Sequence, residues 1–365
     1  MLTKKIFSVI LLLAGFTTGF SQEKTFRIEG KVIDAATLQP LNGASAFCQN
    51  TTYGVTCNND GIFAMRLPNG GYDLAVSYTG YETKSIRISN TQPNTDTLVI
   101  ALTQQNQVLT EVAVVATNEV MDGWSRFGKF FSDNFIGTTS NAAECVIKNP
   151  EALHFFYTKN KKRHKLKVTC KEDLLIQNNA LGYLIRYQLD SFNYDYNSNI
   201  SQYTGYPFFI KTDSTPEAEV QHIKNRAKTY LGSRLHFMRA LYDSIVVDEG
   251  FMVEKMEGGG GKEPVGKIIE DLYDSSIYQA DSNTVAVNWE GRYRVSYKNV
   301  NPDKKFLEEF KLPSNSRMQV TLLDAADGFV IEENGFFYEQ YDVINTGYWG
   351  WKKLAEALPY DYTYE

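Results

Sequence analysis

The sequence is poor in metal-binding residues, with only four cysteines and four histidines. No two cysteines form a C-x-x-C pair, which argues against a zinc knuckle. No histidine has a carboxylate three residues later, and no H-E-x-x-H occurs, so the ligands of a zinc carboxypeptidase are absent. The sequence therefore predicts neither a metal site nor a cofactor.

Motifs for nucleophilic and phosphate chemistry are also missing. No G-x-S-x-G segment marks a serine hydrolase. The glycine run at 258–261 is followed by Lys262 without the Ser or Thr of a phosphate loop, so it indicates a linker. The adjacent carboxylates Glu332 and Glu333 would point to different faces of a strand and are interpreted as ordinary surface charge. These absences predict no catalytic residues.

The chain has no excess of positive charge and no long apolar run beyond residue 21. Its net charge of −6 argues against nucleic acid as a partner. A hydrophobic content of 43% is enough for packed cores, and an aromatic content of 13% suits a protein rich in strands. We therefore expect a folded protein with no transmembrane helix in its mature form.

The first 21 residues have the pattern of an export signal. Lys4 and Lys5 precede an apolar run over residues 6–16, and Gly19 and Ser21 are small residues at the positions that a signal peptidase reads. The alternative is a membrane anchor, but the run is shorter than the roughly 20 residues that a spanning helix needs. We expect cleavage after residue 21 and a protein exported to the periplasm, the outer membrane or the cell surface.

Residues 24–103 alternate short strand patterns with turn signals. Strands are expected at 26–33, 44–47, 54–57, 62–67, 72–78, 83–88 and 97–102. Gly43 and Gly61 stand where turns need positive φ, and Gly80 indicates a bulge or tight corner. This spacing, with no helical stretch, predicts a small sandwich of about seven strands.

Four segments of this region carry a family resemblance. They are Gly30-Lys31-Val32-Ile33-Asp34, Pro40-Leu41-Asn42-Gly43-Ala44, Asp60-Gly61-Ile62-Phe63 and Tyr78-Thr79-Gly80-Tyr81. In order and spacing they resemble the carboxypeptidase regulatory-like module of exported and outer-membrane proteins of the Bacteroidota. The resemblance implies a transthyretin-like, carbohydrate-binding-like β-sandwich and supplies no nucleophile or base.

Residues 104–120 are interpreted as a linker. Within them, Leu109-Thr110-Glu111-Val112-Ala113-Val114-Val115 resembles the short strand that follows this module in TonB-dependent receptors. Further blocks resemble a domain found behind the module in other exported proteins, without supplying an activity. These blocks are 135–137, 147–150, 178–183, 230–241, 347–349 and 358–360.

Residues 121–365 are predicted to form a second domain of the α+β class. Helices are expected at 122–135, at 215–245 with a kink at Gly232, and at 350–357 before Pro359. A flexible loop is expected over 256–266. Strands are expected at 144–147, 153–157, 166–170, 174–177, 181–189, 267–272, 286–289, 293–297, 319–323 and 329–332.

The four cysteines, Cys48, Cys57, Cys145 and Cys170, permit two disulfides in an oxidising compartment. If Thr52 and Tyr53 form a two-residue turn, Cys48 and Cys57 face each other at a separation that a disulfide accepts. The alternative is that all four are buried thiols that pack as small apolar residues. Both interpretations stay open.

Two segments are candidate binding surfaces. The basic run includes Lys161, Lys162, Arg163 and Lys165, which could contact lipid or lipopolysaccharide phosphates, although a solvated hairpin loop is the simpler interpretation. The aromatic stretch includes Tyr194, Tyr196, Tyr203 and Tyr206, whose rings could stack on sugars or pair across strands.

These observations predict an exported, non-enzymatic binding or docking protein whose partner is an envelope glycan, peptidoglycan or an outer-membrane protein. One alternative is an enzyme, most simply a hydrolase, whose site is assembled in the second domain with His154 or His236 as base. Another alternative is an accessory component of a TonB-dependent receptor system.

Overall fold

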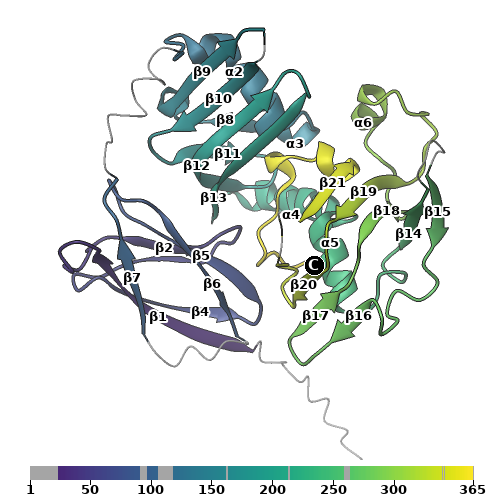
Figure 1. The fold of residues 1–365 in the computed structure, drawn as a ribbon, viewed down its shortest axis with the longest axis horizontal. Coiled ribbons are helices and arrows are strands. Elements are labelled where there is room, and N and C mark those ends of the chain that lie inside the picture. The colour runs from purple at the N-terminus through teal and green to yellow at the C-terminus, as the bar shows by residue number, and fades with distance from the viewer. Residues whose placement is uncertain are drawn as a thin grey trace, which may run out of the picture.

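The computed structural model describes residues 24–90, 97–105, 118–161, 163–212, 214–258, 264–338, 340 and 342–364. The expected export signal, the strand expected at 109–115 and residues 259–261 of the glycine run lie outside the described residues. The ribbon forms three parts, an N-terminal sandwich and two sheet-containing lobes, with the C-terminal segment between them (Figure 1). In the described part of the chain, no helix is both long and apolar enough to cross a membrane.

The N-terminal sandwich contains the seven predicted strands. One sheet has the order β4-β1-β7 and the other has the order β3-β2-β5-β6. Their bounds are β1 Thr25–Asp34, β2 Ser45–Cys48, β3 Gly54–Thr56, β4 Ile62–Pro68, β5 Gly71–Ser77, β6 Lys84–Ser89 and β7 Leu98–Leu102. Alternating side chains of β1, such as Ile28 and Val32, are buried in the core between the sheets. The mainly β sandwich predicted from the sequence is confirmed.

Two glycines of the sandwich turns confirm the predicted positive φ but differ in their surroundings. Gly43 has φ of 81°, and a Cβ built there would meet no atom within 4 Å. Gly61 has φ of 71°, and a Cβ there would lie 2.5 Å from the carbonyl oxygen of Val32. Only Gly61 therefore needs the absence of a side chain for close packing as well as for backbone conformation.

We expect Gly61→Ala to lower the free energy of unfolding by about 2 to 3 kcal/mol, because the left-handed strain adds to a backbone clash. Gly43→Ala is the matched control and should cost only about 1 kcal/mol, the strain alone. Urea denaturation of both variants measures the difference. Equal losses would show that the close approach to Val32 relaxes without cost.

The first lobe of the second domain is a six-stranded sheet covered by a helix. Its strands are β8 Cys145–Ile147, β9 Leu153–Lys159, β10 His164–Cys170, β11 Leu174–Asn178, β12 Tyr183–Asp195 and β13 Ile200–Lys211. The path is β8-β11-β12-β10-β9, and β13 pairs with β12 along almost its whole length. Helix α2 (Gly123–Phe135) packs Phe131 and Phe135 on one face of this sheet. The helix predicted at 122–135 is therefore confirmed.

The second lobe contains a five-stranded sheet, β15-β14-β18-β19-β21, and a three-stranded sheet, β16-β17-β20. The strands are β14 Phe251–Glu257, β15 Val265–Ile268, β16 Tyr278–Ala280, β17 Thr284–Val287, β18 Gly291–Tyr297, β19 Gln319–Ala325, β20 Phe329–Glu332 and β21 Val343–Gly347. The remaining short helices of the second domain are α3 Ser140–Ala143, α6 Lys304–Glu309 and α7 Tyr348–Trp351, and its 3₁₀ turns are η1 Pro150–Ala152 and η2 Leu354–Glu356. The core of this lobe surrounds the fully buried Trp289.

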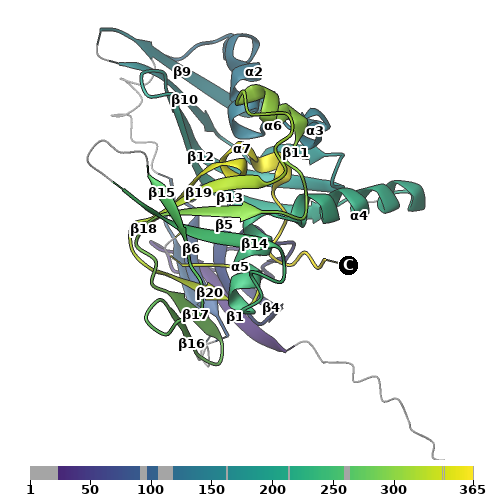
Figure 2. The same cartoon turned by 90° about the vertical axis from the view of Figure 1, so that its right-hand side faces the viewer.

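The helix predicted over 215–245 is two helices, α4 (Pro216–Tyr230) and α5 (Arg234–Tyr242). The break is complete rather than a kink, because Gly232 has φ of 73° and Ser233 caps α5 by accepting the His236 N–H. The apolar spacing at the start of α4 does not produce a buried face. Val220 is 54% exposed on α4, which projects beyond the sheets in Figure 2.

The structure also differs from the predictions for the last helix and for the ends of the long loop. The helix expected at 350–357 is divided into α7 and η2, with Lys352 and Lys353 between them. Strand β14 continues to Glu257 and pairs with β15 from Val265 onward, so both ends of the loop expected over 256–266 are strand, and residues 259–263 lie outside the described residues. Strands β13, β14, β16 and β21 and helices α3 and α6 were not predicted.

The sandwich is joined to the first lobe through the outer edge of β13. Asn50 donates its N–H to the carbonyl of Pro207 at 2.8 Å, and Phe209 donates to Thr51 at 2.9 Å. These bonds satisfy edge groups of β13 that would otherwise be unpaired. The sandwich therefore continues the hydrogen bonding of the sheet.

An arginine of the first lobe reinforces the same contact. Arg186 donates to Ser45 Oγ at 3.0 Å, and its guanidinium lies 5.3 Å and 5.1 Å from the ring centres of Phe47 and Phe208. Phe47 belongs to the sandwich and Phe208 to β13, so one cation contacts aromatic rings from both parts. The sandwich is thus a fixed part of the molecule rather than a module on a free linker.

A buried carboxyl joins the sandwich to the second lobe and corrects the interpretation of Glu332 as surface charge. Glu332 is fully buried, whereas Glu333 is exposed. Ser89 and Tyr338 donate hydroxyl hydrogen bonds to Glu332 Oε1, but its buried Oε2 has no partner among the described residues. Burial raises the pKa of Glu332 above its ordinary value of 4.5, although these two hydrogen bonds oppose the rise.

We expect Glu332→Gln to stabilise the protein increasingly as the pH rises above 4.5, by about 1 to 3 kcal/mol at pH 8. A carboxyl whose folded pKa is raised contributes less stability as pH rises through that pKa, because ionisation is easier in the unfolded chain. Thermal unfolding of wild type and variant between pH 5 and pH 8 measures the gap, with Glu333→Gln as the exposed control. A gap that does not change with pH would contradict a raised pKa.

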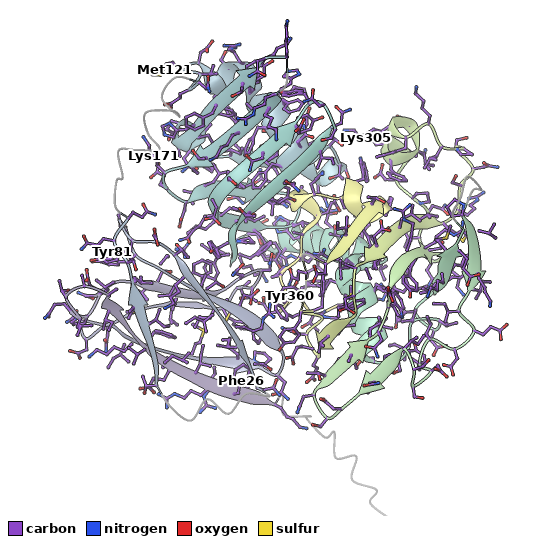
Figure 3. The ribbon with its side chains drawn as sticks, in the orientation of Figure 1. Phe26, Tyr81, Met121, Lys171, Lys305 and Tyr360 are labelled. Carbon is purple, nitrogen blue, oxygen red and sulfur yellow. The ribbon has the colours of Figure 1, made fainter. Side chains whose placement is uncertain are left out.

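The C-terminal strap, residues 358–364, connects the three parts. Its Tyr360 donates its N–H to the Asn50 carbonyl at 2.7 Å, and Asp361 accepts both the N–H, at 2.9 Å, and the hydroxyl of Thr52. Tyr360 is labelled at the junction of the three parts in Figure 3. The strap therefore fastens to the sandwich at one turn, residues 50–52.

The other side of the strap is held by α5. Arg239 donates to the carbonyls of Tyr360 and Tyr362, both at 2.8 Å, and to that of Asn334 at 3.1 Å. Its guanidinium lies 5.7 Å from the ring centre of Tyr230, at the end of α4. One side chain thus links the strap to the β20 end of the second lobe.

Candidate functional site

A cavity of about 470 Å³ lies where the two lobes of the second domain meet. The first lobe contributes α3 and the C-terminal half of α4, and the second contributes the segment 300–304, the start of β19 and α7. The lining residues are Thr139, Ser140, Asn141, Asn225, Lys228, Thr229, Val300, Asn301, Pro302, Asp303, Lys304, Gln319, Tyr348, Trp351, Lys352 and Glu356. We call it the interlobe cavity. Junctions between packed units are common positions for ligand sites.

Lys352 and Glu356 form the charged centre of the interlobe cavity. They lie at i and i+4, with Lys352 Nζ 3.9 Å from Glu356 Oε2, and their side chains are only 12% and 8% exposed. Burial lowers the pKa of the Lys352 ammonium, Glu356 opposes the shift and Lys228 adds to it. The ammonium also lies 5.2 Å from the centre of the Tyr348 ring.

Polar groups around this centre are held by the protein's own hydrogen bonds. Asn141 donates to Thr229 Oγ1 at 3.0 Å, and Thr229 donates to Glu356 Oε2 at 3.4 Å. Gln319 is 4% exposed, and its Oε1 has no hydrogen-bond partner among the described residues. That oxygen lies beside Gly232 and Tyr297 without accessible surface, so the polar wall of the cavity is formed by Asn141, Thr229 and Glu356.

Two aromatic residues form another wall. Tyr348 and Trp351 pack with Phe306 of α6, and the Trp351 indole donates to Glu309 at 2.9 Å. The Tyr348 hydroxyl accepts the Asp303 N–H at 3.3 Å. Both rings are therefore held in place, and a ligand would meet preformed aromatic surface.

A second cavity, of about 440 Å³, lies at the end of the five-stranded sheet beside Met256 and Ile344. Its one arginine is already paired, because Arg292 Nε and Nη2 donate to the two carboxylate oxygens of Asp324 at 2.6 and 3.1 Å, and its other charged lining residue is Asp342. A bidentate pair of this kind has little hydrogen-bonding capacity left for a ligand. The interlobe cavity is therefore the stronger candidate.

The two histidines considered as bases lie beside carboxylates but line neither cavity. His154 Nδ1 is 2.7 Å from Glu119 at a sheet edge. His236 is buried, accepts the Gly232 N–H at Nδ1 and contacts Glu249 through Nε2 at 3.0 Å. Burial lowers the pKa of His236, although Glu249 opposes this shift, and the Nδ1 contact places the proton of the neutral ring on Nε2. This ring supports the break between α4 and α5.

The basic run lies at the β9–β10 hairpin, away from the interlobe cavity. Lys161, Arg163 and Lys165 are exposed, and Lys165 pairs with Asp195 at 3.2 Å. Lys162 lies outside the described residues.

No group of three or more His, Cys, Asp or Glu in the described part of the chain is placed to hold a metal ion.

The tyrosine-rich stretch forms the β12–β13 hairpin and is divided between its faces. Tyr194 and Tyr196 pack on Phe130 of α2, at ring distances of 4.7 and 5.4 Å, and Tyr203 lies 5.0 Å from Phe135. Tyr206 is opposite Gln188, on the face towards the sandwich. The four tyrosines therefore do not form one exposed platform, and three of them pack within the lobe.

The turn proposed for a Cys48–Cys57 disulfide is wrong. Phe47 pairs with Gly54 and Ala46 with Val55, so Cys48 is opposite Tyr53 and Cys57 is opposite Ala44. The two cysteines share a face of the hairpin but are four positions apart along it, too far for a disulfide. Both are free, buried thiols whose pKa is raised by burial, Cys57 to about 11.

The seven strands of the sandwich, with their order and spacing, can be compared with known domains. Residues 28–114 match the CarboxypepD_reg-like domain. The match includes all of β2 to β7, so this domain supplies Asn50 and Thr52, to which the strap binds. No curated protein matches the chain.

Two solved structures are similar to parts of the chain. A streptococcal ancillary pilin is 18% identical over 23% of this chain and 30% of its own, with a TM-score of 0.20. A DUF3823 family protein from Bacteroides ovatus ATCC 8483 is 12% identical over 52% of this chain and 83% of its own, with a TM-score of 0.18. The chain thus spans less than a third of the pilin, and the site is defined by its own residues.

Sequence reasoning missed the interlobe cavity because its residues are dispersed from 139 to 356. One local signal was present. Lys352 and Glu356 are four residues apart beside Tyr348 and Trp351, a spacing that places a charge pair next to aromatic rings on one helical face. Nothing in the sequence indicated that α3 and α4 would close over them.

Proposed function

We propose that this chain is a non-enzymatic binding protein of the bacterial cell envelope, with its ligand site in the interlobe cavity. The observation that carries the proposal is this cavity, with a nearly buried ammonium, a buried amide and two fixed rings. The export pattern of residues 1–21 and the resemblance to modules of exported Bacteroidota proteins support a periplasmic or outer-membrane location.

In this proposal the CarboxypepD_reg-like domain has a structural role. It is bonded to β13, to Glu332 and to the strap, so it fixes the outer sides of both lobes. Fixing the lobes keeps the cavity preformed and lowers the entropic cost of binding. An accessory role beside a TonB-dependent receptor is compatible with this arrangement but has no separate observation in its favour.

The test uses the chain without residues 1–21, incubated with solubilised envelope glycans and peptidoglycan fragments, desalted and examined by native mass spectrometry. We expect a retained small ligand in the wild type. Ser140→Trp places a large ring at the cavity lining and should abolish retention. Ser198→Trp, on the exposed β12–β13 turn, is the matched control and should retain the ligand.

The alternative of a hydrolase is tested with the same proteins. A panel of glycosidase, esterase and peptidase substrates should show no turnover above background. Turnover that Ser140→Trp removes and Ser198→Trp preserves would replace the binding proposal with catalysis in the same cavity. Absence of a retained ligand in both the wild type and Ser198→Trp would contradict the binding proposal itself.

A further inference from the structure

The Lys352 ammonium is short of hydrogen-bond acceptors. Its separation of 3.9 Å from Glu356 exceeds a hydrogen-bond distance, and its other close contact is the face of the Tyr348 ring. A nearly buried ammonium without full pairing is costly unless water or a ligand in the cavity supplies the missing acceptors. An oxyanion within hydrogen-bond reach would restore both the charge balance and an acceptor.

The charges of the interlobe cavity favour an anion. Three lysines, Lys228, Lys304 and Lys352, face two carboxylates, Asp303 and Glu356. Lys228 and Lys304 are exposed, whereas Lys352 is deep, so positive charge extends from the surface inward.

The two carboxylates are already engaged. Asp303 Oδ1 accepts the Lys305 N–H at 2.8 Å, and Glu356 accepts the Thr229 hydroxyl. One oxygen of each carboxylate is therefore occupied, and the lysines of the lining outnumber its carboxylates three to two.

The remainder of the lining is suited to a polyhydroxylated ring rather than to a bare anion. Amides and hydroxyls come from Asn141, Asn225, Asn301, Thr139 and Ser140. Ligand hydroxyls can both donate to and accept from these amides and hydroxyls, whereas an inorganic anion without hydrogens can only accept. The rings of Tyr348 and Trp351, which are 4% and 6% exposed, also line this cavity.

We propose that the interlobe cavity binds an acidic sugar, a single pyranose-sized ring that carries a carboxylate. The carboxylate accepts hydrogen bonds from Lys352 Nζ, the ring hydroxyls bind the amide side chains, and the apolar edge of the ring lies against Tyr348 and Trp351. This inference rests on the proposed binding function and names its ligand class.

The experiment is isothermal titration calorimetry on the chain without residues 1–21. The probes are D-glucuronate and D-galacturonate, their neutral counterparts D-glucose and D-galactose, and acetate and inorganic phosphate as anions without a ring. We expect one uronate to bind at least about tenfold more tightly than its neutral counterpart, since a charge-assisted hydrogen bond is made only by the acid. Acetate and phosphate should bind more weakly than that uronate.

Three variants assign the effect to Lys352. Lys352→Met should remove the preference for the acid, whereas Lys305→Met, on the exposed side of α6 (Figure 3), should leave it unchanged. The double variant Lys352→Met/Glu356→Gln removes both buried charges at nearly constant volume, so it provides a folded comparison if the single variant unfolds. It should also lose the preference.

The outcomes separate this inference from the proposed function. Neutral sugars that bind as tightly as the acids would overturn the anionic assignment and leave the binding function standing. Acetate or phosphate as tight as the uronates would overturn the sugar assignment. If no probe binds while native mass spectrometry still shows a retained ligand, the ligand class is wrong but the cavity is a binding site.

Discussion

Arg239→Met is expected to lower the free energy of unfolding by about 3 to 5 kcal/mol, because it removes three charge-assisted hydrogen bonds at once. The carbonyls of Tyr360, Tyr362 and Asn334 would lose their donor in a partly buried position, and Met cannot replace it. The effect should therefore exceed that of an ordinary surface substitution.

Thermal and urea denaturation measure this loss, and hydrogen exchange at the strap locates it. The matched control is Arg234→Met on the same helix, whose guanidinium lies 5.3 Å from the Phe337 ring centre and stacks rather than bonding the strap. The control should cost about 1 kcal/mol. If both variants lose the same stability, Arg239 does not hold the strap in solution.

Asp361→Ala is expected to cost about 3 kcal/mol, because two donors of Thr52 lose a charged acceptor. The amide of Thr52 should then exchange with solvent much faster, since its hydrogen bond to Asp361 is gone. Asp361→Asn keeps an acceptor oxygen without the charge and should recover about half of the loss.

The measurement is amide hydrogen exchange of the turn at 50–52, together with the melting temperature. Slow exchange of Thr52 in Asp361→Ala would show that the sandwich stays docked through its other contacts, at β13, Arg186, Glu332 and Tyr360. The contribution of the strap to docking would then be small.

The sandwich could be predicted from the sequence because the patterns that specify its strands and turns lie within short segments. Alternation along β1 and the Asp60-Gly61 turn specify strands and corners with few competing interpretations. The register between β2 and β3 was harder to predict. The hairpin turn was predicted two residues away from its true centre, and this error placed Cys48 and Cys57 opposite each other. Turn length cannot be read from strand pattern alone when no Asn-Gly or Asp-Gly pair marks it.

The second domain was predicted less completely because its determinants are tertiary. Val220 continues an apolar period but is exposed, since α4 extends past the sheet that would cover it. A glycine such as Gly232 between two helical patterns allows either a kink or a break. The helix breaks here because Ser233 caps α5 and the His236 ring accepts the Gly232 N–H. The interlobe cavity depends on packing between lobes, which no single segment encodes.

The hydrogen bonds between Thr52 and Asp361 join residues separated by 309 positions. Contacts of such high sequence separation pay a large loop-closure entropy and tend to form late. The sandwich and each lobe can gather their own cores earlier, but their final arrangement waits until residue 361 is available. Assembly of this protein is therefore expected to end with a slow docking step, after most secondary structure has already formed.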